Sequence, residues 1–259
     1  MVCYSNTLCY FYGYGKFFYK SIIMERKKNL VSYILKFALI FTYFSIIFSD
    51  SKHTYNYKIK FFGITVANCQ VIYSDTSIYD ISAKKIQYKV TTNSFIDKIF
   101  KVNNDYTIIL NKNNYNTLYY KKNTFQPKIT NYVETDYSSG ILKYKNSDII
   151  VDNSNKNIFS VLYMIHSGHI EALDNIELIE REGKYYSFSY LLSKNNEIII
   201  SMDEIDSSNQ GIIEHTDIFS WGLFLNNTKK TIIYNKDEKY IEKCIFKKGI
   251  TSISAKIIK

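Results

Sequence analysis

The chain has 259 residues, a formal net charge of +9 at pH 7 and 22% charged residues. Because the two signs are interspersed and no basic stripe carries interleaved aromatic residues, the composition argues against a nucleic-acid partner. Tyr and Phe supply most of the 17% aromatic content, while Pro and Trp occur once each. This composition favours β-structure over helix.

A short basic cluster, Arg26-Lys27-Lys28, precedes an apolar run over residues 31–48, and polarity returns abruptly at Ser49. A positive region, an apolar stretch and small residues at its exit are typical of a secretory signal or an N-terminal membrane anchor. The run is close to the minimum of ~17 residues that spans a bilayer core. We therefore expect residues 24–51 to be a signal peptide or an anchor, and leave both open.

Residues 1–23 are rich in aromatic residues and show no helical or strand period. We interpret them as an extension upstream of a true start at Met24, or as a short cytoplasmic tail. Residues 52–259 are then long enough for a single β-rich domain with a sizeable core. The localisation that we expect is the periplasm or cell envelope of a Gram-negative bacterium, with a transient or lasting membrane contact through residues 31–48.

Apolar and polar residues alternate with a period of two throughout residues 52–259, which is typical of half-buried strands with one solvated face. The clearest segments are Tyr55–Phe61, Lys85–Val90, Tyr186–Tyr190 and Ser252–Ile257. Shorter β-branched or aromatic runs are Tyr106–Leu110, Leu118–Tyr120, Ile129–Val133, Ile149–Val151, Ile198–Met202 and Thr231–Tyr234. Strands every ~8–12 residues, mostly without helical crossovers, predict an antiparallel meander.

One segment departs from this period and predicts an amphipathic helix. Asn153-Ser154 offers an N-terminal cap, and Gly168 ends the run. The apolar residues between them recur at helical spacing, at Ile158, Val161, Leu162 and Ile165. A helix of ~3 turns is long enough to cover one face of a curved sheet. Residues 94–101 are compatible with a second short helix or with a bulged strand.

Two cysteines, Cys69 and Cys244, lie in the β-rich part. One disulfide between them is compatible with an oxidising compartment. Two buried, unpaired thiols are the other interpretation, and the sequence does not decide between them.

Few residues suggest chemistry. His166 and His169 are spaced as a zinc half-site that Glu171 or Asp174 could complete, but a histidine near a helix C-terminus is also favoured by the helix dipole. His215 lies in a turn-rich stretch without a motif-like nucleophile. No phosphate-binding glycine loop, serine nucleophile elbow or dinucleotide fingerprint occurs. We therefore predict no catalytic residue, no cofactor and no metal site.

The aromatic faces of the expected strands are interpreted mainly as core. If the sheet is curved but not closed, the same inward side chains would also line an apolar groove beneath the helix. The candidate groove residues are Tyr57, Phe61, Leu162, Ile165, Tyr186, Phe188, Tyr190 and Trp221.

Three stretches together resemble an exported bacterial family known as domain of unknown function 3108. These are the opening strand at residues 57–67, the helix at residues 157–163 and the closing hairpin at residues 235–251. The family usually has a glycine where Ala67 stands, and its expected proline is absent from this closing hairpin. The resemblance implies an envelope protein whose curved antiparallel sheet, a half-barrel, embraces one helix. By analogy this architecture is comparable to that of periplasmic lipoprotein carriers of the LolA–LolB type.

We therefore predict a mainly β, non-enzymatic envelope protein that binds an apolar or amphipathic ligand, such as a lipid, in a half-barrel groove. The alternative is a structural module that docks another envelope protein, and a hydrolase is a distant third. A cavity of several hundred Å³ under the helix would favour the binder, whereas a solid core with an exposed apolar patch would favour the docking module.

Overall fold

The computed structural model describes Lys36 and residues 52–258, apart from 128, 145–146, 152–155, 194, 206–222 and 225–226. By its internal contacts the chain divides into two compact units, Met1–Asp50 and Ser51–Lys259, and the second is described below. Apart from Lys36, the predicted signal or anchor at residues 24–51 lies outside the described residues, as does the extension at residues 1–23. None of the helices in the described part combines the length and apolar character that crossing a bilayer requires.

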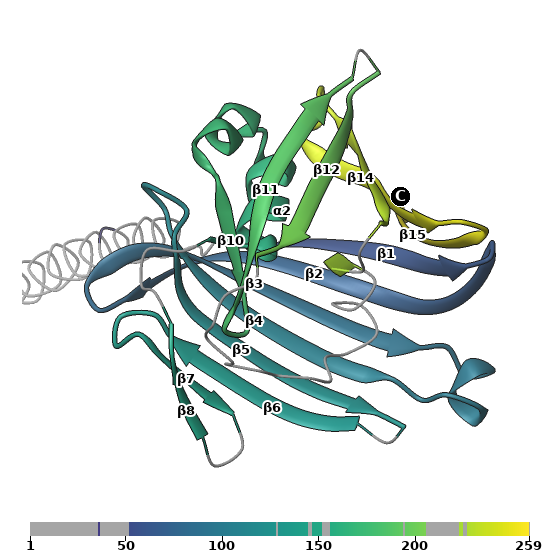
Figure 1. Ribbon diagram of the computed structural model, residues 1–259, viewed down its shortest axis with the longest axis horizontal. Helices are drawn as coiled ribbons and strands as arrows, with labels where there is room; N and C mark the ends of the chain where they lie inside the picture. Colours follow the sequence, from purple (N-terminus) through teal and green to yellow (C-terminus); the bar gives the residue numbers. More distant parts are fainter. Residues whose placement is uncertain are drawn as a thin grey trace, which may run out of the picture. The chain divides into compact units, whose positions relative to one another are not determined.

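The described residues of the second unit form one curved sheet of fifteen strands (Figure 1). The strands are β1 (His53–Phe61), β2 (Ile64–Ile78), β3 (Ile81–Thr92), β4 (Asn103–Asn111), β5 (Thr117–Gln126), β6 (Ile129–Asp136), β7 (Ile141–Tyr144), β8 (Ser147–Ile150), β9 (Lys156–Asn157), β10 (Leu178–Arg181), β11 (Lys184–Leu192), β12 (Glu197–Glu204), β13 (Lys229–Asn235), β14 (Tyr240–Lys248) and β15 (Thr251–Ile257). Their order is β8-β7-β6-β5-β4-β3-β2-β1-β15-β14-β13-β12-β11-β10-β9. The predicted fold class, a mainly β protein with a single curved sheet, is confirmed.

The pairings are antiparallel throughout this sheet except at one edge, where β9 pairs with β10 in parallel. The exception arises because β9 leads directly into the helix, so that the chain returns to the sheet by a crossover and not by a hairpin. The two halves of the sheet, β1–β8 and β10–β15, are joined by the ladder between β1 and β15, in which Tyr57 lies opposite Ile257 and Phe61 opposite Ile253.

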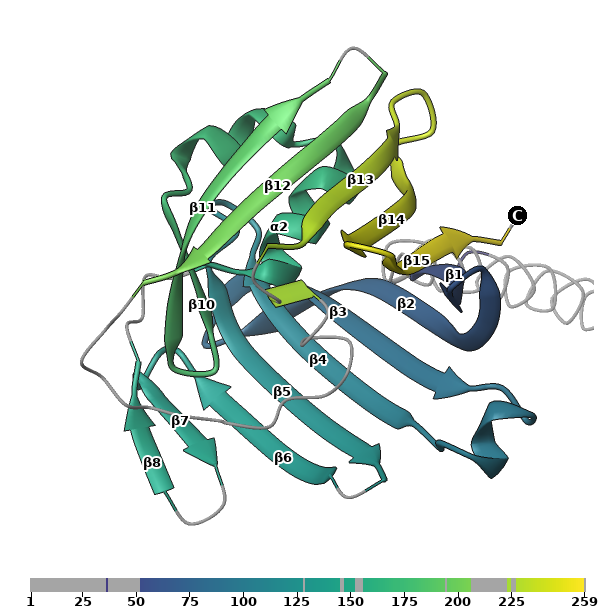
Figure 2. The ribbon, with the colours of Figure 1, turned by 45° about the vertical axis from the view of Figure 1, so that its right-hand side comes forward.

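The period-2 alternation directs one face of each strand inward. In β4, for example, Asn104, Tyr106, Ile108 and Leu110 are buried, whereas the residues between them are partly or fully exposed. Figures 1 and 2 show the sheet curving so that its concave face surrounds the helix α2 (Ile158–Ser167). The core of the unit therefore lies between the concave face and this helix.

The helix begins later than the sequence suggested. Asn157 is its N-cap, with an extended backbone and a side-chain oxygen that accepts a hydrogen bond from Ser160 N at 3.0 Å. The predicted cap, Asn153-Ser154, is wrong, because an Asn directly before the first apolar turn can satisfy the same N–H groups. The helix ends as predicted at Gly168, whose φ of 82° is left-handed. A Cβ at Gly168 would lie 2.8 Å from the Tyr234 hydroxyl.

The apolar face of α2 packs against the sheet. Ile158, Val161 and Ile165 are buried, and Leu162 is partly buried. At the helix start, the Phe159 ring lies 5.0 to 6.0 Å from the rings of three tyrosines on β3, β4 and β5: Tyr88, Tyr106 and Tyr120.

The described part of the chain also contains two short 3-10 helices. The first, η1 (Ile96–Lys98), lies between β3 and β4 and resolves the ambiguity over residues 94–101. Asn93 Oδ1 accepts a hydrogen bond from Ile96 N at 2.9 Å, which starts this turn. The second, η2 (Ile170–Asn175), follows α2 and leads into β10.

Candidate ligand cavity

A cavity of about 440 Å³ lies between the concave face of the sheet and α2. Its walls come from β1 to β4, β14, β15, the η1 connection and the helix, with Leu223 from the connection between β12 and β13. The lining residues are Tyr57, Ile59, Phe61, Val66, Ala67, Cys69, Val71, Tyr73, Tyr88, Val90, Thr92, Ile96, Ile99, Phe100, Val102, Tyr106, Phe159, Leu162, Leu223, Ile241, Cys244, Phe246, Ile253 and Ala255. No Asp, Glu, Lys, Arg or His is among these lining residues.

Strand alternation explains most of this wall. Tyr57, Ile59 and Phe61 line the cavity from β1, and small residues oppose Ile59 on both neighbouring strands. Ala67 pairs with Ile59 on one side, and Ala255 pairs with Ile59 on the other. Small side chains at these positions leave space that the helix does not fill.

A β-bulge adds one further wall residue. The register between β1 and β2 shifts so that Ile59 pairs with Ala67, whereas Lys60 pairs with Thr65. Val66 therefore has no opposite residue in β1, and both Val66 and Ala67 line the cavity.

The cavity opens to the surface at one end of the sheet. Phe61, Ile99 and Phe100 line the cavity and are also exposed to solvent. Because these residues belong to the end of β1 and to the connection between β3 and β4, the mouth lies where these two segments meet.

The wall is electrically neutral. Tyr57 donates its hydroxyl proton to the carbonyl oxygen of Ile241 at 3.0 Å, and burial raises the pKa of Tyr57. Burial raises the pKa of both Cys69 and Cys244 to about 12, so both thiols stay protonated at physiological pH. The two cysteines are unpaired. A cavity of this character accommodates hydrocarbon without burying an uncompensated charge.

Three of the predicted groove residues, Tyr57, Phe61 and Leu162, line this cavity. Trp221 lies outside the described residues. The remaining four candidates, Ile165, Tyr186, Phe188 and Tyr190, lie elsewhere in the unit.

These four residues have other surroundings. Ile165 is fully buried in the core, and the Tyr186 ring packs 4.6 Å from the ring of Phe224. Tyr190 donates its hydroxyl proton to Asp174 Oδ1 at 2.6 Å. The strand β11, which carries Tyr186, Phe188 and Tyr190, is separated from the cavity-lining strand β14 by β12 and β13. Alternation predicted an inward face for this strand but gave no information about its place in the sheet.

Sequence reasoning missed the wall contributed by the η1 connection and by β14. Ile96, Ile99 and Phe100 were noted only as part of an ambiguous helical or bulged segment. Phe246 and Cys244 come from a strand whose position beside β15 follows from the tertiary fold. The apolar residues of the short segment between β3 and β4 were the one signal that the sequence offered for this part of the site.

A second buried region of the concave side is polar. Lys122 on β5 forms an ion pair with Glu182, which lies in the turn between β10 and β11, and both side chains are almost completely buried. Tyr120 donates a hydrogen bond to the same carboxylate at 3.1 Å. This pair links β5 to the β10–β11 hairpin across the concave side.

Glu180 extends this polar region. Tyr137 donates a hydrogen bond to Glu180 Oε2, and Gly183 N donates one to Oε1 at 2.6 Å. Burial raises the pKa of Glu180 to about 7, although these two hydrogen bonds favour the charged form and oppose the shift. None of these residues lines the apolar cavity.

The structure separates the histidines considered as a zinc half-site. His166 is buried between the rings of Tyr55 and Tyr73, and its Nδ1 accepts a hydrogen bond from Ile241 N at 3.3 Å. Burial, and secondarily the charge of His53, lowers the pKa of His166 to about 4. His169 is exposed.

The other residues of that hypothesis do not converge either. Asp174 accepts the hydrogen bond from Tyr190, and Glu171 is exposed. No group of three or more His, Cys, Asp or Glu side chains in the described ranges could hold a metal ion. His215 lies outside those ranges.

No family model matches the chain, and no curated protein matches it in sequence. A solved structure, described as a beta-barrel-like protein of domain of unknown function DUF1849 from Brucella abortus, is similar with a TM-score of 0.41 and 7% sequence identity. The similarity covers 81% of this chain and 96% of that chain.

Proposed function

We propose that this protein is a non-enzymatic binder of an apolar or amphipathic ligand, such as a molecule with an acyl chain, in the cavity beneath α2. The observation that carries the proposal is an open cavity of about 440 Å³ with a neutral wall. Its volume lies within the range of ~300–1,000 Å³ that is usual for small-molecule sites.

The chemistry of the wall supports an acyl ligand. Each methylene group that leaves water for an apolar site contributes ~0.8 kcal/mol, so a chain of several carbons binds without any ionic contact. Phe61, Ile99 and Phe100 at the open mouth are partly in solvent. A polar head group would therefore remain in water while the chain enters the cavity.

A structural docking module is the alternative, and a solid core would have favoured it. The extracytoplasmic address stays a prediction, and so does the resemblance to domain of unknown function 3108. The ionisable side chains of the polar region, including Lys122 and Glu182, do not line the cavity, which supports a binding role over a hydrolytic one.

The test fills the cavity. Full-length protein is titrated with cis-parinaric acid, a fluorescent fatty acid, and compared with Ala255→Trp. We expect the indole to occupy space that would hold at least two methylene groups, which corresponds to about tenfold weaker binding. Ser254→Trp is the matched control, because Ser254 is adjacent on β15 and points to the opposite face.

Both variants are compared by circular dichroism and by their urea denaturation midpoints. Equal affinity of the wild type, Ala255→Trp and Ser254→Trp would contradict binding in this cavity.

A further inference from the structure

Three connections lie together at the open end of the cavity. We define the apolar rim as residues 60–64, 93–101 and 247–251. Phe62 N donates a hydrogen bond to Ser252 O at 3.1 Å, and Asn93 N donates one to Val66 O at 3.1 Å, so the three connections adjoin one another. Figure 1 shows the β1–β2, β3–β4 and β14–β15 turns at the right-hand end of the unit.

The tips of the apolar rim expose large hydrophobic side chains. The exposed fractions are 51% for Phe62, 68% for Ile64, 70% for Phe95, 75% for Ile99 and 89% for Ile250. Single exposed apolar residues are ordinary on protein surfaces, but a group of them at adjoining turns indicates an interaction site. Four of the five, all except Ile99, do not line the cavity.

Positive charge accompanies these apolar tips. Residues 60–64, 93–101 and 247–251 contain five exposed lysines, Lys60, Lys98, Lys101, Lys247 and Lys248, and a single acidic residue, Asp97. The carboxylate of Asp97 accepts a hydrogen bond from the Thr92 hydroxyl.

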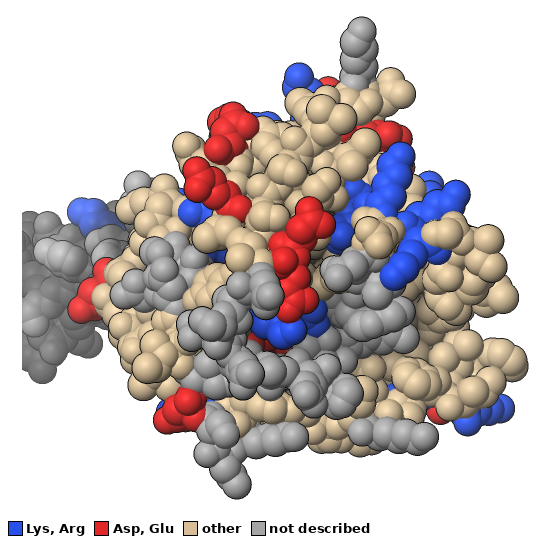
Figure 3. Space-filling view, viewed as in Figure 1, with Lys and Arg blue, Asp and Glu red and all other residues tan. Residues whose placement is uncertain are grey.

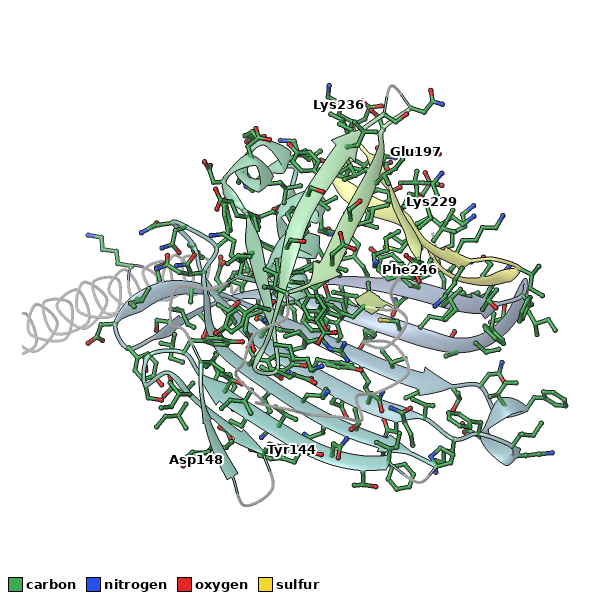
Figure 4. All side chains as sticks on the ribbon, in the orientation of Figure 1. Tyr144, Asp148, Glu197, Lys229, Lys236 and Phe246 are labelled. Atoms are coloured by element: carbon green, nitrogen blue, oxygen red, sulfur yellow. The ribbon has the colours of Figure 1, made fainter. Side chains whose placement is uncertain are left out.

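Lysines continue beyond the rim on the neighbouring strand. Figure 3 shows Lys and Arg side chains beside the β14–β15 end and at the lower right, near the β3–β4 connection. Figure 4 labels Lys229 on β13 and Phe246, a cavity-lining residue on β14. Lys229 pairs with Lys247 in the sheet.

We propose that the apolar rim docks on the surface of a lipid bilayer that contains anionic lipids. Apolar tips that enter the boundary between head groups and acyl chains, with lysines that contact anionic head groups, are the two recurrent elements of interfacial membrane binding. The flexible stems of the lysines allow their ammonium groups to reach the head groups while the tips insert. The cavity mouth then faces the lipid.

The charge pattern favours a bilayer over a protein partner. The cores of protein–protein interfaces are depleted in lysine, whereas here each apolar tip has lysines within a few residues in sequence. The inference goes beyond the proposed function and stands independently of it, because Phe62, Ile64, Phe95 and Ile250 contribute nothing to the cavity wall.

The test measures where the rim lies in full-length protein added to preformed vesicles of phosphatidylcholine and phosphatidylglycerol. An environment-sensitive fluorophore is attached at Ile250→Cys, with Cys3 and Cys9 replaced by serine. Protein without the introduced cysteine provides the blank for Cys69 and Cys244, whose raised pKa makes them poor nucleophiles. Vesicles that contain a spin-labelled phospholipid then quench any fluorophore that enters the bilayer.

The matched control is Leu191→Cys on β11, an apolar position with 65% exposure that is outside the rim. We expect quenching at position 250 and none at position 191. Lys247→Glu/Lys248→Glu should lose this quenching, and salt should weaken it in the unaltered rim, because electrostatic attraction to the surface is screened.

Equal quenching at positions 250 and 191, or none at 250, would overturn the proposal. The proposal would also be overturned if, without vesicles, the fluorophore at position 250 became more shielded from solvent as the protein concentration rises. That result would make the rim an interface between copies of the chain. Binding of cis-parinaric acid by Lys247→Glu/Lys248→Glu is measured in parallel and should be unchanged. Circular dichroism confirms the fold, and Lys98→Glu at a separate turn gives a second charge variant. If the wild type does not bind cis-parinaric acid but the fluorophore at position 250 is still quenched, the proposed function is rejected and the membrane-docking proposal is not.

Discussion

The concave side of the sheet contains two buried regions built on opposite plans. Around β1 to β4, β14 and β15, inward residues are aromatic, aliphatic or small, and a cavity of about 440 Å³ remains. Around β5 and the β10–β11 turn, Lys122 and Glu182 extend toward each other and form a buried ion pair. The same backbone pattern thus leaves a cavity where small residues such as Ala67 and Ala255 stand among neutral inward side chains, and it bridges the interior where two inward side chains are long and oppositely charged.

This difference gives the two regions different roles. A neutral cavity is suited to hydrocarbon but loses the packing contacts that a filled core would have. The buried ion pair leaves little freedom in how β5 and the β10–β11 hairpin sit, because a displaced partner would leave a charge without compensation. Binding and maintenance of the curved shape therefore depend on different residues.

The largest effect should come from breaking the ion pair on one side. Lys122→Met leaves Glu182 buried without its cation, which should lower the free energy of unfolding by ~3–5 kcal/mol. Urea denaturation followed by circular dichroism measures this loss. Lys184→Met is the matched control, because Lys184 pairs with Glu204 at 2.7 Å on the surface and should cost at most ~1 kcal/mol. Similar small losses for both variants would remove the distinction between the two regions.

A second comparison contrasts the packed face of α2 with its cavity face. Ile165 is fully buried, so Ile165→Ala should lower the free energy of unfolding by ~2–5 kcal/mol. Leu162 borders the cavity and is partly exposed, so Leu162→Ala removes fewer contacts and should cost clearly less. The two midpoints in urea measure the difference. Equal losses would mean that Leu162 is packed as tightly as Ile165.

The third prediction concerns the pH dependence of stability that Glu180 causes. The folded protein holds the Glu180 proton up to about pH 7, whereas the unfolded chain releases it near pH 4.5. The folded state therefore binds more protons in this window, and the Glu180 contribution to the free energy of unfolding falls as pH rises, by at most ~1.4 kcal/mol per pH unit. Above the window the loss stays constant.

The measurement is the difference between wild type and Glu180→Gln from pH 5 to pH 8. His166 has the opposite dependence, since its pKa is lowered from 6.5 to about 4, and its stability contribution is lost as pH falls through that window. Because both proteins retain His166, its contribution cancels in the difference. A pH-independent difference would show that Glu180 titrates normally in the folded state.

Much of the fold could be predicted from the sequence, because alternation and helical spacing are local properties of the chain. The strand at Tyr55–Phe61 and the helix face formed by Ile158, Val161 and Ile165 are examples. The N-cap was misplaced because several Asn and Ser residues near Asn157 have the same capping chemistry. Local patterns of this kind identify elements better than they identify boundaries.

The site was less predictable, for two physical reasons. The first is that the neighbours of a strand depend on the whole fold, so Phe246 and Phe188 have similar local patterns but only Phe246 lines the cavity. The second is that a buried polar residue is indistinguishable from a solvated one until its partner is known. Lys122 therefore gave no sign of burial, because Glu182, which compensates its charge, is distant in sequence.

The ladder between β1 and β15 also constrains how the protein can fold. Hairpins such as β2–β3 form from neighbouring segments, but β1 and β15 are separated by nearly the whole of the unit, and such non-local pairing slows folding. Before this ladder forms, β1 and β15 each have an unpaired edge, which is the feature of folding intermediates that promotes aggregation. Because the cavity takes its wall from both sides of this ladder, a folding intermediate with two formed half-sheets would still lack a binding site.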